Sequence, residues 1–504
     1  MAEGIAVPFA EPRDEPDTAV RARRRPPVPL LALLVTALVL GVLWAALIPA
    51  YQSPDEQSHF GAVQSLGERF ALPGDPARRP FSSESDIAGG FVNVNQVAGQ
   101  AFVKPEWSEA QERRWRSDGV NGVDAPRNDG GGPNTAALNP PAFYAWDAIA
   151  YTADSAGDFF DRLFAARLFS MLWLPVTVLG TWLLTGELLG RRRVLQFTAA
   201  ALPALAPMVV FISASVNPDG MLYALASLAL WLGVRCARRG MDWRHGAGLF
   251  AAVGLACTVK ATAYAFLPAA LAVAVMELLR RRGIGPRHLL RIGLTALVPL
   301  ALTLGVWLVL SRALGRAAAP QVAGAGAVGS GTNIRELLSY VWQYYLPRLP
   351  FMTPYPNPAG IHPWFEVWVK QGTAAFGWLE VRFPDPVYTV VGLAVIGALL
   401  ATLLALWRAR RQIPGRVAVF VVLFAGGLLA GLHWTDYHQL EAGSRGFMQG
   451  RYLFPLIGLG GAALAAIVAL LPRRWQPTGA ATVVGLVLVL QVLSLGLVAE
   501  RFYA

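Results

Sequence analysis

The stretch PPVPLLALLVTALVLGVLWAALIPAYQSPDEQSHF (residues 26–60) contains an apolar run that is followed directly by acidic residues. Its apolar part, residues 29–49, has about the 20 residues that a helix needs to cross a bilayer. Asp55 and Glu56 come soon after it, and His59 follows one helical turn later. Ionisable side chains this close to hydrocarbon are costly and commonly functional. The stretch therefore predicts a membrane-spanning helix that ends at a candidate functional site.

The composition of the whole chain indicates a membrane protein with many spans. Of 504 residues, 55% are hydrophobic and 15% are charged, and the mean hydropathy is +0.43. Soluble proteins carry about 25% charged residues. The formal net charge is +11, but the basic residues form short clusters between apolar runs, a pattern that sets membrane orientation and predicts no nucleic-acid partner. The clusters are RARRR (21–25), RRR (191–193), ARR (237–239), RRR (280–282), RARR (408–411) and RR (473–474).

Apolar runs of suitable length predict about eleven transmembrane helices. The runs cover residues 29–49, 162–189, 194–213, 219–236, 246–260, 262–279, 288–311, 386–407, 416–432, 451–471 and 479–498. With the N-terminus in the cytoplasm, every basic cluster falls on the cytoplasmic side. One long helix over 245–279 would place the cluster at 280–282 outside, so two short helices that break near Lys260 are expected. The C-terminus is then expected outside.

The chain divides into alternating membrane and aqueous segments. We expect a disordered cytoplasmic tail (1–28), a first transmembrane helix (29–49), a first extracytoplasmic loop (50–161), helices 2–7 (162–311), a second extracytoplasmic loop (312–385) and helices 8–11 (386–504). The first loop holds sixteen acidic and eight basic residues, the reverse of the cytoplasmic clusters. The second loop becomes aromatic in its later part, which is typical of interfacial helices.

Two interpretations fit the acidic pair on local grounds. The segment SPDE is typical of a helix start, with Ser53 as the cap, Pro54 as the first helical residue and Glu56 in the capping-box position. Alternatively, a carboxylate at the boundary between water and lipid can accept a proton from a hydroxyl group or bind a divalent cation such as Mg²⁺ or Mn²⁺. The first interpretation leaves the placement of the acids at the mouth of the membrane unexplained.

Short motifs, taken together in their order and spacing, resemble one bacterial family. They are PDEQSHF (54–60), NPPAFY (139–144), SVNPDGMLYALASLALWL (215–232), VKATAYAFLPAALAV (259–273) and QGRYLFPLIG (449–458). The family is DUF2142, a group of bacterial polytopic membrane proteins. A short tail, one helix and an acidic pair that opens a large outer loop also resemble the GT-C class of integral-membrane glycosyltransferases. The resemblance implies an all-α polytopic membrane protein with a GT-C-like helical bundle.

The same resemblance implies an enzyme of the bacterial cytoplasmic membrane whose active site faces outside. GT-C enzymes generally take a sugar from a polyprenyl-phosphate or polyprenyl-diphosphate donor and transfer it to a glycan, lipid or protein acceptor. By the resemblance, Asp55 is the general base that deprotonates the acceptor hydroxyl, and Glu56 orients the acceptor or helps to bind a cation. Partial burial beside a second acid is expected to raise the pKa of Asp55, which favours a base near neutral pH.

Other residues of the motifs are candidates for the substrate pocket, namely His59, Asn139, Tyr144, Asn217 and Asp219. NPPAFY resembles the HPPLYY of several such enzymes, with Asn139 where His is common. The alternative for this motif is a proline-terminated loop that leads into an interfacial helix. For Asp219, at the start of a predicted helix, capping is the favoured interpretation.

Lys260 and Arg451 are the candidates for binding the donor phosphate. Lys260 is one of only three lysines and lies between two apolar runs, where a cation is commonly paired or functional. The alternative is a lysine that extends to the outer interface. Arg451 begins a span on the side where basic residues are not expected, and its guanidinium could form a bidentate contact with phosphate. An ion pair with an acid of an outer loop is the alternative.

The segment HWTDYHQLE (433–441) offers a further group of polar side chains on the outer face. His433, Asp436, His438 and Glu441 could ligate a metal, but their spacing matches no strong template, and a polar, aromatic interfacial loop is the favoured interpretation.

Other functional classes make different demands on the sequence. A transporter or flippase of lipid-linked glycans favours charges at mid-membrane depth and two similar halves, whereas the charges here lie mostly at the ends of spans. A glycan polymerase or ligase shares the lipid-linked substrate and the membrane location. A scaffold without catalysis leaves the acidic pair without a role.

Overall fold

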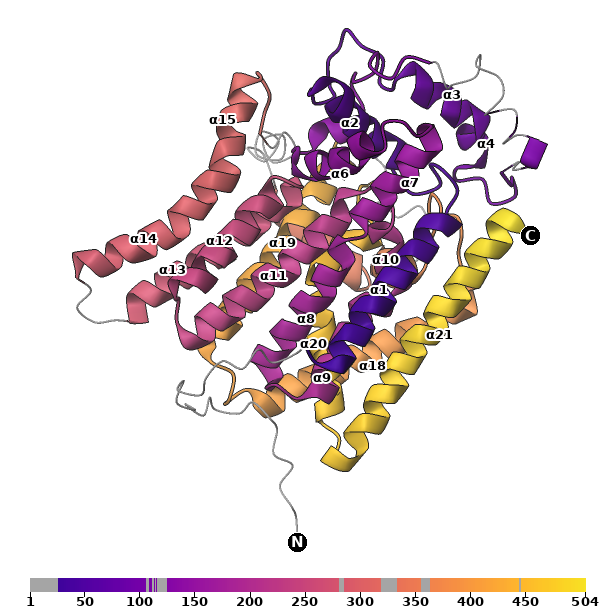
Figure 1. Ribbon diagram of the computed structural model, residues 1–504. Coiled ribbons are helices and arrows are strands. Elements are labelled where there is room, and N and C mark those ends of the chain that lie inside the picture. The colour runs from indigo at the N-terminus through magenta and orange to yellow at the C-terminus, as the bar shows by residue number, and fades with distance from the viewer. Residues whose placement is uncertain are drawn as a thin grey trace.

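The apolar runs fold into helices that pack as one bundle in a computed structural model of the chain (Figure 1). The structure describes residues 26–105, 108–110, 113, 115, 125–280, 285–318, 333–354, 363–443 and 446–504. Within them, nine helical segments are long and apolar enough to cross a membrane. Four of them are single helices: Val28–Leu47 (α1), Pro218–Arg239 (α11), Asp385–Ala409 (α18) and Gly415–Glu441 (α19). The other five each combine two or three consecutive helical elements. They are Phe159–Leu189 (α7, Phe159–Ser170, and α8, Trp173–Leu189), Ala261–Arg280 (η2, Ala261–Phe266, and α13, Leu267–Arg280), Pro286–Ala313 (α14, Pro286–Leu300; η3, Ala301–Gly305; α15, Val306–Ala313), Gly450–Ala469 (η6, Gly450–Leu456, and α20, Ile457–Ala469) and Arg473–Tyr503 (η7, Arg473–Trp475, and α21, Gln476–Tyr503). The chain is therefore an all-α, multi-pass membrane protein.

The predicted count of eleven spans is not confirmed, although each predicted run lies on helical residues. The described chain gives nine spans, or ten if α9 (Arg193–Leu205) and α10 (Pro207–Ser213), which are bent by 57° at their junction, count as one. The remaining run forms α12 (Trp243–Cys257), which has only 15 residues. The predicted break near Lys260 is confirmed, because α12 ends before this residue and η2 begins directly after it.

The described residues between α1 and α7 include short helices at one end of the bundle, here called the loop end (Figure 1). They are α2 (Glu56–Arg69), α3 (Ser83–Phe91), α4 (Val94–Val97), η1 (Thr135–Leu138) and α6 (Ala142–Ala153). The C-terminus lies at the same end, where the Tyr503 hydroxyl donates to the Leu47 carbonyl at 2.9 Å and Arg501 donates to the Gln100 carbonyl at 2.8 Å. The first loop and the C-terminus are thus on one side of the bundle. The sequence predicts the same, from the number of spans between the basic clusters.

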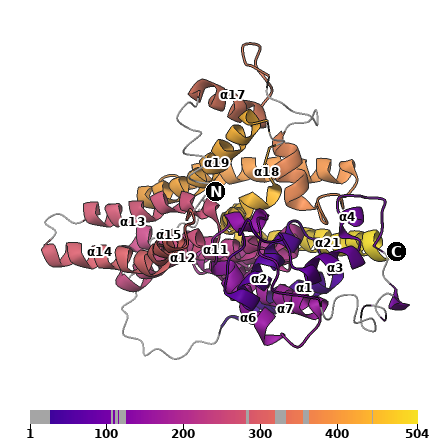
Figure 2. The same ribbon diagram turned by 90° about the horizontal axis from the view of Figure 1, so that it is seen from above.

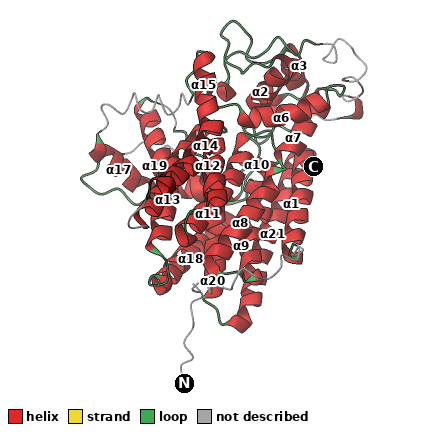
Figure 3. Cartoon of the chain, turned by 60° about the vertical axis from the view of Figure 1, so that its left-hand side comes forward, coloured by secondary structure: helices red, strands yellow, loops and turns green. Residues whose placement is uncertain are grey.

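The later part of the second predicted loop is also helical. It contains α17 (Ile334–Tyr345) and a π-helical segment, η5 (Phe365–Gln371). Figures 2 and 3 show α17 beside α19 at the edge of the bundle, where Tyr340 and Tyr344 pack with Tyr437. Of the tail predicted at 1–28, residues 1–25 lie outside the described residues.

Helix α11 is the central element of the bundle. It packs against α8, α12, α19 and α20, and 83% of the residues in its most apolar part are buried. A Cβ on Gly180 of α8 would lie only 2.9 Å from the Cβ of Ser227, so this glycine allows the two helices to approach closely, as small residues do in membrane helix pairs. Because α11 is held on several sides, the residues at its N-terminus have a fixed position.

Candidate active site at the end of helix α1

The chain turns sharply between α1 and α2, and the acidic pair lies at the end of this turn. Tyr51 and Asp55 have left-handed backbone angles, with φ of 62° and 63°, a region that Asn, Asp and Gly tolerate best. Helix α2 begins at Glu56, and the Asp55 side chain makes no capping hydrogen bond. The predicted helix start at Pro54 with Ser53 as its cap is therefore wrong.

Asp55 belongs to a chain of alternating charges that comes from separate segments of the sequence. Arg451 Nη2 donates to Asp55 Oδ2 at 2.6 Å, and Arg451 Nε lies 3.3 Å from Asp219 Oδ2. Lys260 Nζ donates to Asp219 Oδ1 at 2.5 Å. The turn after α1, the start of α11, the break after α12 and the start of η6 therefore meet at one point. The structure thus brings together the base candidate and both phosphate-binding candidates.

The guanidinium of Arg451 is buried but only partly paired. Its side chain is 4% exposed. Within the described part of the chain Nη1 forms no hydrogen bond, and Nε has only the 3.3 Å ion contact with Asp219. A buried donor without a partner costs about 1–3 kcal/mol, and more when it is charged. Arg451 therefore has strong donors available for an anionic ligand.

Aromatic side chains position this charged group. The ring centre of Tyr452 lies 4.6 Å from Lys260 Nζ and 5.5 Å from the guanidinium carbon of Arg451, within the range of cation–π attraction. The Tyr223 hydroxyl donates to the backbone carbonyl of Arg451 at 3.1 Å. Neither tyrosine is among the site residues that the sequence predicts. Tyr452 follows Arg451 directly in the QGRY motif, whereas nothing in the sequence marks Tyr223.

Glu56 occupies a fully enclosed position, with 0% exposure. Its Oε1 accepts from Arg167 Nε at 2.8 Å and from the Val216 backbone N–H at 3.2 Å. Its Oε2 accepts from Arg167 Nη2 at 2.5 Å and from the Tyr51 backbone N–H at 3.1 Å. Each carboxylate oxygen thus already serves two protein donors, which distinguishes Glu56 from the partly exposed Asp55.

Arg167 of α7 is a third residue of this region that the sequence does not predict. Its Nη1 donates to the carbonyls of Ala45 and Ile48 at 3.0 and 2.6 Å, and its Nη2 donates to the Pro49 carbonyl at 3.0 Å. Together with its bonds to Glu56, these contacts tie the end of α1 to the start of α2. A signal was present, because Arg167 lies in an apolar run near the side where basic residues are not expected.

His59, Asn139 and Tyr144 form a neutral polar group near Asp55. The Tyr144 hydroxyl lies 2.9 Å from His59 Nδ1 and accepts from Asn139 Nδ2 at 3.1 Å. Burial lowers the pKa of His59 to about 4, although the charge of Asp55 opposes this. His59 is therefore neutral near pH 7. Asn139 also precedes α6, so the loop interpretation of its motif holds as well.

The pKa of the Asp55 carboxyl is lower than its usual value. Burial acts to raise this pKa, but the positive charges of Arg451 and Lys260 lower it by more. The predicted rise is therefore wrong, because the sequence does not reveal that a guanidinium lies against this carboxylate. Asp55 is ionised at neutral pH and forms an ion pair.

Asn217, rather than Asp219, caps helix α11. The Asn217 Oδ1 accepts from the Asp219 backbone N–H at 3.0 Å, and its Nδ2 donates to the Pro54 carbonyl at 3.4 Å. The favoured interpretation of Asp219 as the cap is thus wrong, and its carboxylate binds Lys260 instead. Asn217 links the start of α11 to the turn that carries Asp55.

The polar segment at 433–441 forms the last turns of α19 rather than a loop. His433 lies 3.2 Å from the Tyr340 hydroxyl and 2.9 Å from the Tyr345 hydroxyl, and Asp436 accepts from Tyr340 at 2.7 Å. These side chains bind the aromatic residues of α17. A metal site at this segment is the alternative that the sequence leaves open.

The described residues do not supply a metal site at either place. No group of three or more His, Cys, Asp or Glu side chains among them could hold a metal ion. Beside Asp55, the second predicted ligand of Mg²⁺ or Mn²⁺ was Glu56, whose oxygens are engaged by Arg167 and by backbone N–H groups. Glu56 is therefore not free to act as the second ligand that the sequence suggests.

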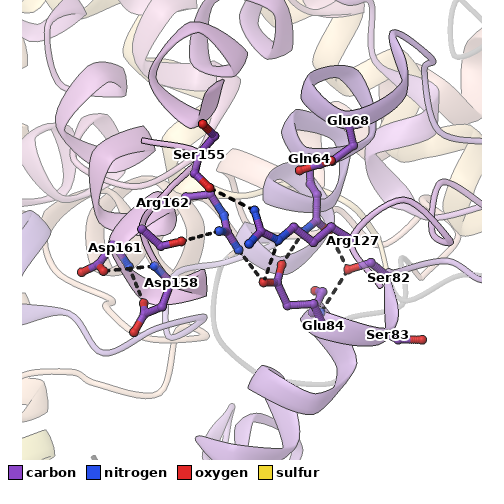
Figure 4. A network of polar contacts seen from close by, with 12 residues as sticks. Gln64, Glu68, Ser82, Ser83, Glu84, Arg127, Ser155, Asp158, Asp161 and Arg162 are labelled. Atoms are coloured by element: carbon purple, nitrogen blue, oxygen red, sulfur yellow. Dashed lines mark hydrogen bonds and ion pairs between the residues drawn. The ribbon is translucent and has the colours of Figure 1, made fainter. Parts of the chain in front are cut away.

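A buried polar network fixes the short helices of the loop end against the bundle (Figure 4). Glu84 of α3 accepts from Arg162 of α7 at 2.5 Å and from Gln64 of α2 at 2.9 Å. Arg127 donates to the Ser155 carbonyl at 3.1 Å and lies 3.5 Å from Glu84. The network holds α2, whose first turn belongs to the candidate site, in a fixed position.

The sequence also matches a known family over most of its length. Residues 38–459 fit the family described as "Predicted membrane protein (DUF2142)". The chain belongs to this family. Among curated proteins, no sequence matches it.

Solved membrane-protein structures resemble this DUF2142 protein at low sequence identity. The crystal structure of ArnT from Cupriavidus metallidurans bound to undecaprenyl phosphate matches with a TM-score of 0.41 and 15% identity, over 88% of this chain and 61% of that one. The crystal structure of the Archaeoglobus fulgidus oligosaccharyltransferase tethered with an acceptor peptide matches with a TM-score of 0.45 and 12% identity, over 94% and 55% of the two chains. The DUF2142 protein thus spans less than two thirds of the length of either protein.

Proposed function

We propose that this protein is a GT-C-type glycosyltransferase of the bacterial cytoplasmic membrane. It transfers a sugar from a polyprenyl-phosphate or polyprenyl-diphosphate donor to a glycan, lipid or protein acceptor on the extracytoplasmic side. The observation that carries the proposal is the contact between Asp55 and Arg451, since the Nη1 group of the buried guanidinium forms no hydrogen bond within the described chain. A lipid-linked donor needs a base and a phosphate-binding group side by side, because its reactive carbon is bonded to its phosphate.

In this proposal, Arg451 and Lys260 bind the donor phosphate. A guanidinium matches phosphate oxygens with paired hydrogen bonds, and the lysine adds a second positive charge. The phosphate competes with Asp55 for Arg451, and this contact is one that lowers the Asp55 pKa. Donor binding therefore raises the basicity of Asp55 and converts it from an ion-pair partner into a base.

The transfer step then follows as a direct displacement. The acceptor hydroxyl gives its proton to Asp55 while its oxygen forms a bond to the anomeric carbon of the donor. The bond between that carbon and the phosphate oxygen breaks, and its electron pair leaves with the phosphate, where Arg451 and Lys260 stabilise the developing charge. The configuration at the anomeric carbon is inverted.

Glu56 has a positioning role in this proposal rather than contact with the acceptor. Its bonds to Arg167 and to the backbone N–H groups of Tyr51 and Val216 hold the turn in which Asp55 lies.

A donor-saturation assay with variants of the cations tests this proposal. We expect Arg451→Lys to raise the donor KM about tenfold or more, because a point charge does not replace the bidentate contact. Lys260→Met is expected to raise it as well. The assay uses purified protein in liposomes with a labelled polyprenyl-phosphate sugar, and Arg79→Lys, at a half-exposed arginine of the loop end, serves as the control. Unchanged donor saturation in both cation variants would assign them structural roles.

A further inference from the structure

A polar cavity of about 450 Å³ lies at the end of the bundle opposite the candidate active site. Helix α11 has 22 residues and rises about 1.5 Å per residue, so its two ends are roughly 33 Å apart. Asp219 is at one end, whereas the cavity lies against Arg239 at the other. The cavity therefore cannot belong to the site around Asp55, and a ligand bound in it would be independent of the proposed transferase activity.

Positive side chains dominate the wall of this cavity. Four arginines and two carboxylates line it, from the ends of α11 and α13, the turn before α12 and the first turns of α14. The lining charged residues are Arg235, Arg239, Asp242, Glu277, Arg280 and Arg291. Such a surplus of guanidinium groups between membrane helices suits an anionic headgroup.

The arginines differ in how far the protein neutralises them. Arg235 and Arg239 bind Glu187 of α8 at 2.8 and 2.9 Å. Arg280 is 3.9 Å from Glu277, which is a long contact for an ion pair. Arg291 makes no ion pair with any residue that the structure describes.

The same wall also carries a polar atom that lacks a hydrogen-bond partner among the described residues. The Nε2 atom of His288 is enclosed and has no hydrogen-bond partner in the described part of the chain. His288 and Arg291 are three residues apart on α14, so they lie on one face of this helix. An oxygen-rich anion in the cavity would satisfy both.

The surface next to the cavity is apolar and exposed. Leu290, Leu294 and Leu297 of α14 are 62%, 52% and 65% exposed, and Leu279 of α13 is 79% exposed. Spacings of four and three residues place the three α14 leucines in one stripe along the helix, which starts beside Arg291. The site is thus continuous with a lipid-facing surface, which suits a molecule with an anionic head and hydrocarbon chains.

We propose that this cavity binds the phosphodiester headgroup of an anionic phospholipid, with the acyl chains along the leucine stripe of α14. The basic clusters at 237–239 and 280–282 place this end of the bundle in the cytoplasmic leaflet. Arg291 and Arg280 bind the phosphate, and Arg235 and Arg239 are held in place by Glu187 as the fixed part of the wall.

Lipid binding to the purified full-length chain in neutral detergent tests the proposal. The probes are phosphatidylglycerol, phosphatidylcholine with the same acyl chains, and inorganic phosphate, read by native mass spectrometry and by the thermal unfolding midpoint. We expect phosphatidylglycerol to bind and stabilise the wild type more than phosphatidylcholine does. Arg291→Gln and Arg280→Gln are each expected to weaken this binding about fivefold, and the double variant about 25-fold.

Arg411→Gln is the matched control. It removes an exposed arginine that lies outside the cavity but on the same, cytoplasmic side that the sequence predicts. This variant should keep wild-type lipid affinity. Arg291 has no ion-pair partner among the described residues, so its single variant remains informative if the double variant folds poorly. Equal binding of the two phospholipids, or equal loss in the control, would overturn the proposal. Full stabilisation by inorganic phosphate alone would also overturn it, because the site would then serve a soluble anion.

Discussion

The charge state of Asp55 is set by residues that are remote in the sequence. Locally, Asp55 lies beside another acid, and from that alone its pKa is expected to rise. In the structure, Arg451 and Lys260 reverse this expectation, and Glu56 is neutralised by Arg167 on the other side of the turn. A single sequence identifies these side chains as unusual for their place in the membrane, but it does not show which of them are paired.

The buried imidazole of His59 gives a prediction about pH and stability. Its pKa is about 4 in the folded chain and about 6.5 when unfolded, so between these values only the unfolded chain binds the proton. The wild type therefore loses stability as the pH falls through this window, by about 2 kcal/mol between about pH 7 and pH 5. His59→Gln lacks this loss, so its stability deficit relative to the wild type should shrink at the lower pH. Thermal unfolding in detergent at both pH values measures the difference, and a constant deficit would contradict a neutral buried His59.

At the scale of elements, the turn between α1 and α2 depends on one buried ion pair. We expect Glu56→Gln to destabilise the protein by about 3–5 kcal/mol, because it leaves the charge of Arg167 buried and uncompensated. Thermal or denaturant unfolding measures the loss. Glu109→Gln is the control, since it removes a carboxylate from an exposed pair with Arg113.

The double variant Glu56→Gln/Arg167→Met tests whether Glu56 stabilises the protein through its ion pair with Arg167. It should be more stable than the sum of its single variants predicts, because no unpaired charge remains. Full additivity of the two changes would show that Glu56 does not act through Arg167.

The helices were largely predictable because apolar runs and basic clusters are local signals. The break before η2 was predicted at Lys260, and the structure has it there. Other features could not be predicted from the sequence, because they depend on tertiary contacts. Helix α2 starts at Glu56 rather than Pro54, because Asp55 has a left-handed backbone conformation, with a φ of 63°, and so cannot belong to a helix that starts before it. Similarly, α19 continues through His433 and Asp436, because α17 provides hydroxyl partners for them.

At the scale of the whole molecule, the arrangement of the ends predicts a topology. The loop end carries both the candidate active site and the C-terminus. We propose that it faces away from the cytoplasm, because the described residues of the basic clusters lie at the opposite end. The native cysteines Cys236 and Cys257 are both buried, so engineered cysteines can be labelled over a low background. Asp75→Cys should react with an impermeant maleimide in intact cells, whereas Arg411→Cys should react only after permeabilisation. The reverse pattern would place the candidate active site in the cytoplasm.

The most direct test of the account is the transfer activity of Asp55→Asn. Asparagine keeps the size of the side chain and tolerates the left-handed backbone at this position, so the protein should insert and fold, but it cannot accept the proton of the acceptor hydroxyl. We predict that the variant loses transfer from a polyprenyl-phosphate sugar by about 100-fold or more, whereas Asp75→Asn, at an exposed acid of the same loop, keeps wild-type activity. Wild-type transfer by a correctly folded Asp55→Asn variant would contradict the assignment of Asp55 as the base.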